Sequence, residues 1–271
     1  MLAQIMKNKL QFLVILILLL NSSTLVAEGI SVDAGLTPAQ DRIILRMQYR
    51  FISSTMGSDQ MVMHMTPVVL AYGLTRNITL MMRNGYSFAG LNETMVPMQN
   101  RWMDPFLMGK IKLYRYNSKH YTIGLAAFGG SSFPILKESS AKTYSPKLGI
   151  NASLRLRYWS FDFTNSYEWV NYNSMEKGSQ SRELQANIAI SRNFVLRKFH
   201  NLVLAPVQEF SLVNQQVFNG ESAVVGFISP GLQLVSPHFK LEALYQFPIN
   251  DSNAMGMQNG KRFILGMRFM F

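Results

Sequence analysis

The stretch "KLGINASLRLRY", Lys147–Tyr158, alternates apolar and polar residues along its whole length. Apolar residues stand at every second position from Leu148 to Leu156, and the positions between them are small or polar, including Arg155 and Arg157. Successive side chains of a β-strand point to opposite faces, so this alternation predicts a strand with one apolar and one cationic face.

The next stretch, "WSFDFTNSYEW" (Trp159–Trp169), continues the pattern, with aromatic residues on one face and with Asp162 and Glu168 on the other. A tight turn between the two stretches would make them neighbours in a sheet. Because opposite charges on adjacent strands attract, we expect Arg155 and Arg157 to lie beside these two carboxylates on the polar face.

Ten further stretches alternate in the same way. They are Ile43–Ile52, Met61–Tyr72, Asn77–Phe88, Phe106–Tyr116, His120–Gly130, Glu183–Ser191, Asn201–Val213, Ala223–Val235, His238–Phe247 and Lys261–Phe271. Each has roughly ten residues, the length that a tilted strand needs to cross a bilayer, whereas strands of soluble sandwiches usually have about five or six. Long and short connections mostly follow one another in turn, as expected for extracellular loops and periplasmic turns.

A soluble β-sandwich also alternates, so the chemistry of the two faces has to separate the alternatives. One face is rich in Leu, Ile, Phe and Met, with Tyr or Trp toward the ends, and the other mixes Arg, Lys, Asn, Ser, Thr and Gly. A lipid-facing band with aromatic girdles around a polar lumen has this composition, and only a closed barrel pairs every backbone group in lipid. We therefore predict an all-β fold over residues 43–271, a transmembrane antiparallel β-barrel of about 12 strands (range roughly 10–14).

The first 27 residues have the pattern of a cleavable secretory signal. Two lysines precede the apolar run Leu10–Leu20, and Ala27 ends a suitable cleavage site. The run is shorter than the about 20 residues that a mature transmembrane helix needs. We predict that residues 1–27 are a signal peptide, with an uncleaved anchor as the alternative, and that residues 28–42 form a periplasmic tail or enter the lumen. Export would place the barrel in a bacterial outer membrane.

Composition excludes several kinds of site. The chain has no cysteine, so it can form no disulfide, no Cys-ligated metal site and no thiol-linked lipid anchor. Its formal net charge is +11, but the basic residues are dispersed over the strands, which argues against a nucleic-acid partner. Basic side chains in loops suit contact with lipopolysaccharide, and outer-membrane lipid is the expected surrounding. No residue spacing indicates a metal or another cofactor.

The C-terminal stretch alternates up to its final residue. Met267, Phe269 and Phe271 share the apolar face. This pattern resembles the signal by which outer-membrane barrels are handed to their assembly machinery, which we therefore predict as a partner.

Several stretches resemble a known family. The nearest points are "AYGLT" (Ala71–Thr75) and "PGLQL" (Pro230–Leu234), within diffuse similarity over residues 35–271. The chain resembles the transporter family named after the meta-pathway of phenol degradation. It departs from that family at "FPILKES" (Phe133–Ser139), where a Pro-Thr-Gly loop start is usual. The resemblance implies an outer-membrane barrel of the uptake type.

These observations predict a channel or transporter for small solutes, including apolar or aromatic ones. We predict no enzymatic activity, because none of the four histidines lies in a recognisable Ser-containing catalytic motif. Two alternatives stay open: an outer-membrane lipid-modifying hydrolase, and a non-conducting structural or receptor barrel.

The lumen-facing charges are the candidate functional residues. Arg46 and Arg50 on the first strand and Arg262 and Arg268 on the last would share one seam, because these strands are neighbours in a closed barrel. Glu242, on the penultimate strand, is placed to reach Arg268, and Glu209 lies farther round the wall. The seam could be filled by a salt-bridge network, or it could stay partly uncompensated and favour anions.

Overall fold

The computed structural model describes most of the chain beyond Glu28. The described residues are 29–31, 34–56, 59–91, 101–135, 144–171, 180–196, 202–216, 222–251 and 257–271. The predicted signal peptide, residues 1–27, lies outside them.

The described residues form strands joined by turns and loops. The long strands are β1 (Ile43–Met56), β2 (Asp59–Gly73), β3 (Ile78–Leu91), β5 (Phe106–Asn117), β6 (Tyr121–Ser132), β7 (Ser145–Leu156), β8 (Trp159–Asn171), β9 (Gln180–Arg192), β11 (Leu202–Gln216), β12 (Ser222–Val235), β13 (Phe239–Asp251) and β14 (Met257–Met270). The short strands β4 (Arg101–Trp102) and β10 (Phe194–Leu196) pair with β3 and β11. No helix among the described residues is long and apolar enough to cross a membrane.

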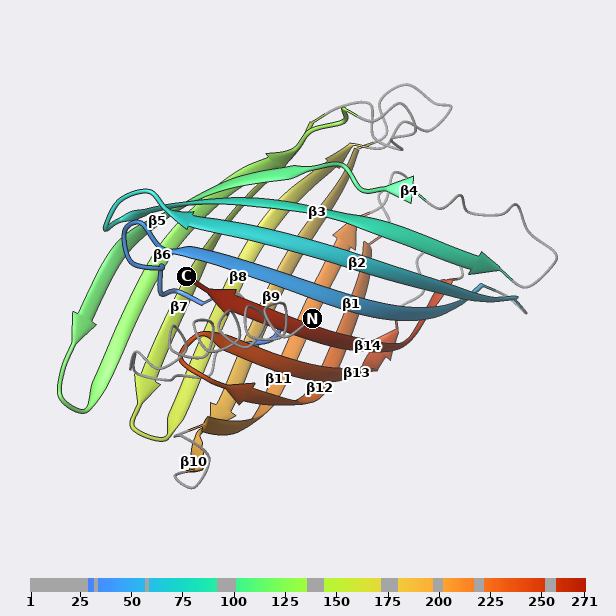
Figure 1. Cartoon of the computed structure of the whole chain (residues 1–271). Helices are drawn as coiled ribbons and strands as arrows, with labels where there is room; N and C mark the ends of the chain where they lie inside the picture. The colour runs from blue at the N-terminus through green and yellow to red at the C-terminus, as the bar shows by residue number, and fades with distance from the viewer. Residues whose placement is uncertain are drawn as a thin grey trace, which may run out of the picture.

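The twelve long strands of the described chain close into one antiparallel barrel. Each pairs with the long strands next to it in sequence, and β14 pairs with β1 to complete the ring. Figure 1 shows the strands tilted around a common axis, with β14 beside β1. The predicted fold class is therefore confirmed.

The two ends of the barrel differ in their connections. At the short-turn end, a few residues join β2 to β3, β5 to β6, β7 to β8 and β12 to β13, and β1 begins and β14 ends there. At the opposite, long-loop end, strands extend beyond the apolar alternation: Met56 on β1 pairs with Asp59 on β2. The link between the alternating stretches Ile43–Ile52 and Met61–Tyr72 is therefore mostly strand, because the ladder continues through polar residues that the alternation does not mark.

The barrel is polar inside and apolar outside. On β7, Leu148 and Ile150 are 55% and 46% exposed, whereas Asn151 and Ser153 are 0% and 3% exposed. A soluble domain buries its apolar face, so this reversed pattern fits a wall surrounded by lipid. Aromatic pairs stand near both ends, such as Tyr116 with Tyr121 and Tyr167 with Trp169, where girdles at the membrane interfaces are expected.

An N-terminal segment, defined as the described residues 29–31 and 34–42, runs inside the barrel. At the short-turn end the backbone N–H of Asp41 donates to the carbonyl of Gly73 over 2.8 Å. Asp41 has a φ of 61°, in the left-handed region that Asp tolerates, and here the chain turns into β1. Deeper in, a Cβ added to Gly35 would lie 2.7 Å from the carbonyl oxygen of Gly124 on β6. The close approach of the segment to the wall therefore requires glycine at position 35.

Candidate functional site in the barrel lumen

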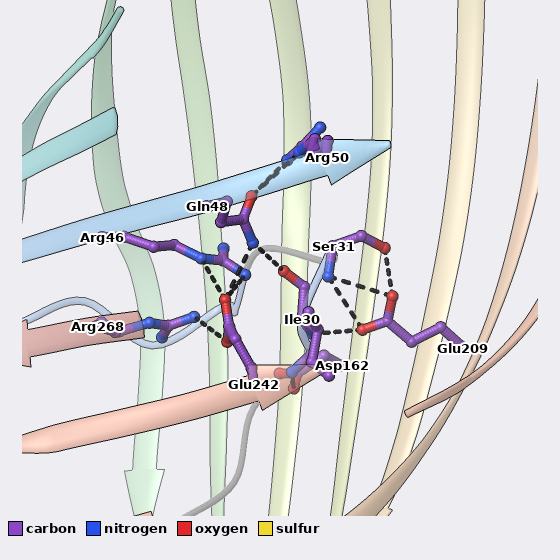
Figure 2. Close-up of polar contacts among 10 residues, drawn as sticks. Ile30, Ser31, Arg46, Gln48, Arg50, Asp162, Glu209, Glu242 and Arg268 are labelled. Carbon is purple, nitrogen blue, oxygen red and sulfur yellow. Dashed lines mark hydrogen bonds and ion pairs between the residues drawn. The ribbon is translucent and has the colours of Figure 1, made fainter. Parts of the chain in front are cut away.

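Glu242 is the centre of the charged seam. Its Oε1 accepts hydrogen bonds from Nε and Nη2 of Arg46, at 2.9 and 2.7 Å, and from Nε2 of Gln48 at 3.0 Å. Its Oε2 lies 3.8 Å from Nη2 of Arg268. Figure 2 shows both guanidinium groups directed at this one carboxylate. Glu242 thus reaches Arg268, as expected, but it binds Arg46 more closely.

The register explains this arrangement. Arg46 and Arg268 stand directly opposite one another on β1 and β14, which would repel without a shared anion. Glu242 pairs in register with Gly266, and a Cβ on this glycine would lie 2.7 Å from Oε1 of Glu242. The absence of a side chain at position 266 therefore leaves the space in which the carboxylate lies.

The other two seam arginines make no ion pair with a described residue. Arg50 donates from Nε and Nη2 to Oε1 of Gln48, at 3.1 and 2.7 Å. Arg262 donates to Asn259 over 2.9 Å, and its guanidinium lies 4.2 Å from the ring centre of Phe227. The seam therefore combines a partly neutralised group around Glu242 with two cations held by neutral groups.

The charges of β7 and β8 pair locally. Arg155 forms a buried ion pair of 2.7 Å with Asp162, and Lys147 pairs with Glu168 over 3.0 Å. Arg157 does not join them: it lies in the turn after β7, exposed, 5.1 Å over the Tyr158 ring. The expectation that it faces the lumen is wrong, because strand β7 ends at Leu156 and the chain turns there, although the alternation in the sequence continues.

Glu209 and Asp162 bind the N-terminal segment. Glu209 accepts hydrogen bonds from the backbone N–H of Ile30, from the N–H of Ser31 at 3.1 and 3.2 Å, and from the Ser31 hydroxyl. The N–H of Gly29 donates to Oδ2 of Asp162 over 3.0 Å. Figure 2 shows the segment between these carboxylates and the seam. Wall carboxylates thus satisfy backbone donors of the segment deep in the lumen.

The opposite side of the segment meets cations and amides. Lys110 on β5 donates to the carbonyls of Ala34 and, over 3.5 Å, Leu36. The Gln48 side chain donates to the Ile30 carbonyl over 3.4 Å. Sequence reasoning did not single out Lys110, because its partners lie on a stretch without any periodic pattern.

A cavity of about 400 Å³ lies between the N-terminal segment and the wall. Its lining includes five segment residues from Ser31 to Pro38 and residues of β1, β2, β3, β5 and β14 among other strands. Arg83 on β3 belongs to this lining and was also missed in the sequence, where one basic residue on a strand carries no distinguishing signal.

The C-terminal residues complete the wall. The backbone N–H of Phe271 donates to the Ile43 carbonyl over 2.9 Å, and Ile43 returns a bond of 3.2 Å. Phe269 and Phe271 stack with ring centres 6.5 Å apart, and Phe271 and Met267 are exposed. The ladder between the first and last strands thus continues through the final residue.

His64, which lies in strand β2, has its side chain outside the lumen. Nδ1 of His64 is 2.6 Å from the Tyr49 hydroxyl, and the His64 ring packs on Phe51. His64 therefore does not contact a serine of the lumen. Among the described residues, no group of three or more His, Cys, Asp or Glu could hold a metal ion.

Solved structures with the same fold are bacterial outer-membrane barrels. An outer-membrane channel from Pseudomonas putida F1 superposes with a TM-score of 0.64 over 91% of this chain and 100% of its own, at 13% identity. The β domain of the Bordetella autotransporter BrkA gives 0.51 over 85% and 100%, at 9% identity. No protein-family model matches the sequence, and neither does any curated protein. At these identities the likeness shows the fold.

Proposed function

We propose that this protein is an outer-membrane channel for small solutes, including apolar or aromatic ones, and that its N-terminal segment closes the lumen. The main support for this proposal is the position of residues 29–31. They lie deep in the barrel and form hydrogen bonds with side chains of β1, β8 and β11. A barrel whose interior holds a separate segment can open without any change in its wall.

The membrane location rests on the outer surface. Large apolar side chains are exposed around the described barrel, while polar side chains are buried inside it. The predicted signal peptide, the C-terminal aromatic pattern and the shared fold with bacterial outer-membrane barrels support the same location. The resemblance to the transporter family of the phenol meta-pathway supports an uptake role.

The attachments of the segment suit a closure that can be released. The bonds to Glu209, Asp162 and Lys110 are polar and can be exchanged for water, and because each involves a charged side chain, the net free energy of releasing one bond is about 1.5–3 kcal/mol. Asp41 provides a turn at the short-turn end, so the segment stays tethered to β1. We expect most solute passage when the segment has left Glu209.

A disulfide between the N-terminal segment and the wall tests whether the segment closes the lumen. The chain has no cysteine, so Leu36→Cys with Gly124→Cys creates a single thiol pair. A Cβ at position 124 would lie 2.6 Å from Cδ2 of Leu36, close enough for a disulfide or a short thiol crosslinker. In planar bilayers, the oxidised or crosslinked protein should conduct less than the same protein after reduction. Equal conductance in both states would remove the segment as the closing element.

A release variant tests the opposite direction. Glu209→Gln replaces an acceptor-only carboxylate by an amide that can face the N–H groups of Ile30 and Ser31 with its own donors. We expect more frequent opening. Glu168→Gln is the matched control, because Glu168 pairs with Lys147 on the wall. An increase for both variants would point to lumen charge instead of release.

A further inference from the structure

The lumen cavity has a strongly one-sided charge. Among the described residues that line it, six side chains are basic and none is acidic. The basic residues are Arg46, Arg50, Arg83, Lys110, Lys147 and Arg268. A water-filled cavity with such a lining attracts anions.

Four of these cations are already engaged. Arg46 and Arg268 share Glu242, Lys147 pairs with Glu168, and Lys110 binds carbonyl oxygens of the N-terminal segment. Lys147 is balanced by its own carboxylate, Arg46 and Arg268 are partly balanced by one shared carboxylate, and Lys110 is directed at the segment. Arg50 and Arg83 differ.

Arg50 and Arg83 have no carboxylate partner among the described residues. Arg50 is held by the Gln48 amide oxygen, and the Arg83 guanidinium lies 4.9 Å from the ring centre of Phe106. Arg46 and Arg83 are close enough to repel the charge of Arg50, and Glu242 is close enough to attract it without forming an ion pair. Arg50 and Arg83 line the same cavity. Arg83 is exposed to the lumen and Arg50 is half-buried, so an anion that enters the cavity can reach both like charges and would be attracted by them.

Register places the two arginines on one wall, two same-face positions apart along the barrel, with Gln48 on the level between them. Arg83 on β3 stands opposite Val69 on β2, which stands opposite Arg46 on β1. Arg50 follows Arg46 four residues along β1, on the same face of the strand. Their guanidinium groups therefore approach the cavity from two strands separated by β2.

The same cavity also has an apolar part. The cavity lining beside Arg83 includes three methionines and two phenylalanines: Met81, Met108, Met270, Phe106 and Phe128. Met81 and Met108 stand opposite one another on β3 and β5. Thioethers and aromatic edges adapt to flat apolar ligands, especially aromatic ones. The cavity thus joins an anion-binding pair to an apolar surface.

We infer that this cavity is a binding site for a small carboxylate with an apolar, ring-sized body, held by Arg50 and Arg83. The binding site itself does not depend on the proposed channel. Only its biological role rests on that proposal, because a carboxylate bound in a channel would be a solute in transit. The volume of about 400 Å³ lies within the range of about 300–1,000 Å³ typical of small-ligand pockets. Arginine recognises carboxylates through two parallel N–H···O bonds, which fixes the ligand head while the methionines contact the body.

The same features select against other solutes. A neutral molecule would leave the guanidinium pair uncompensated. A strongly hydrated anion without an apolar body, such as inorganic phosphate, would lose water against Met81, Met108 and Phe106 without replacing its hydrogen bonds. Charge and an apolar body should therefore both be required for tight binding.

Calorimetric titration of the folded protein in detergent tests this requirement without any need for conductance. Benzoate is the probe, in a zwitterionic buffer of low chloride. Benzamide has nearly the same shape without the charge, and acetate has the charge without the ring. We expect saturable binding of benzoate and at least tenfold weaker binding of benzamide, acetate and inorganic phosphate. Benzamide or phosphate binding as tightly as benzoate would overturn the inference.

Variants locate the site. Arg83→Gln and Arg50→Gln should each weaken benzoate binding about tenfold or more, and Arg83→Lys should weaken it less than Arg83→Gln, because it keeps the charge but loses the planar fork. Arg157→Gln is the matched control, since Arg157 is exposed in the β7–β8 turn. Heat-modifiable migration on a gel checks that each variant is folded. A loss with Arg157→Gln equal to that with Arg83→Gln would place benzoate elsewhere and refute the site.

Conductance of the same variants separates the two proposals. Benzoate binding in a protein that never conducts would leave the site standing and remove the channel. Conductance without saturable benzoate binding would overturn the site and leave the channel.

Discussion

The wall of β7 and β8 and the wall of β14, β1 and β3 both carry basic side chains into the lumen, but they balance the charge differently. On β7 and β8, each cation has its own carboxylate on the adjacent strand, as Arg155 has Asp162. On the other wall, Arg46 and Arg268 share Glu242, and Arg50 has an amide instead.

The difference shows that arginines on the polar face of an alternating strand do not by themselves indicate whether their charge is structural or functional. In β7 the neighbouring strand supplies the counter-charge, so the arginine mainly contributes to the structure of the wall. For β1 the carboxylate comes from β13, on the far side of β14, and this one group, Glu242, serves both Arg46 and Arg268, so a positive field remains in the cavity. The strands around a charge, and not its own strand alone, therefore distinguish structural charges from functional ones.

The largest effect on stability is expected when the carboxylate shared by Arg46 and Arg268 is removed. Glu242→Ala leaves two lumen arginines without their common anion, and removal of one partner from a buried pair costs about 3–5 kcal/mol. Glu168→Ala breaks the partly exposed pair with Lys147 and should cost about 1 kcal/mol or less. Equilibrium unfolding in urea, followed by tryptophan fluorescence in detergent or lipid, measures both. Equal losses of unfolding free energy for the two variants would show that the two walls do not differ in how they balance charge.

A smaller effect is expected where the backbone makes room for Glu242. A methyl group at Gly266 would lie 2.7 Å from Oε1 of Glu242, so Gly266→Ala should destabilise the protein by about 1–3 kcal/mol through displacement of the carboxylate. Gly109→Ala is the control, because a methyl group there meets nothing within 4 Å. The same unfolding measurement applies. A cost for Gly109→Ala as large as that for Gly266→Ala would assign the effect to strand glycines in general.

Much of this fold is predictable from the sequence because lipid and lumen impose opposite demands on alternate residues. The stretch Lys147–Tyr158 became β7 with Leu148 outside and Ser153 inside, and the other eleven stretches also correspond to long strands of the described chain. Ring closure then brought Arg46 beside Arg268. These inferences need only the side-chain period and the order of strands.

The path of the N-terminal segment could not be predicted in the same way. Residues 29–42 have no period, and Ile30 meets Glu209, 179 residues away in sequence, through a backbone N–H that any residue would offer. Likewise, the lumen role of Arg83 depends on the position of β3 relative to β1 and on what the segment leaves open. Such contacts follow from three-dimensional packing inside the barrel, which strand patterns do not contain.

The last prediction concerns the charge that the two walls present to passing ions. In the open state, the cations around Arg50 and Arg83 should make the lumen prefer anions, because a charged pore lining sets ion preference. Reversal potentials across a salt gradient in planar bilayers measure this preference. Arg50→Gln with Arg83→Gln should move the reversal potential toward zero, whereas Lys147→Gln with Glu168→Gln removes a balanced pair from the other wall and should leave it unchanged. Cation preference in the parent protein would show that the carboxylates Glu209 and Asp162, exposed once the segment leaves, outweigh the cationic wall, and the contrast between the walls would then hold only for the closed lumen.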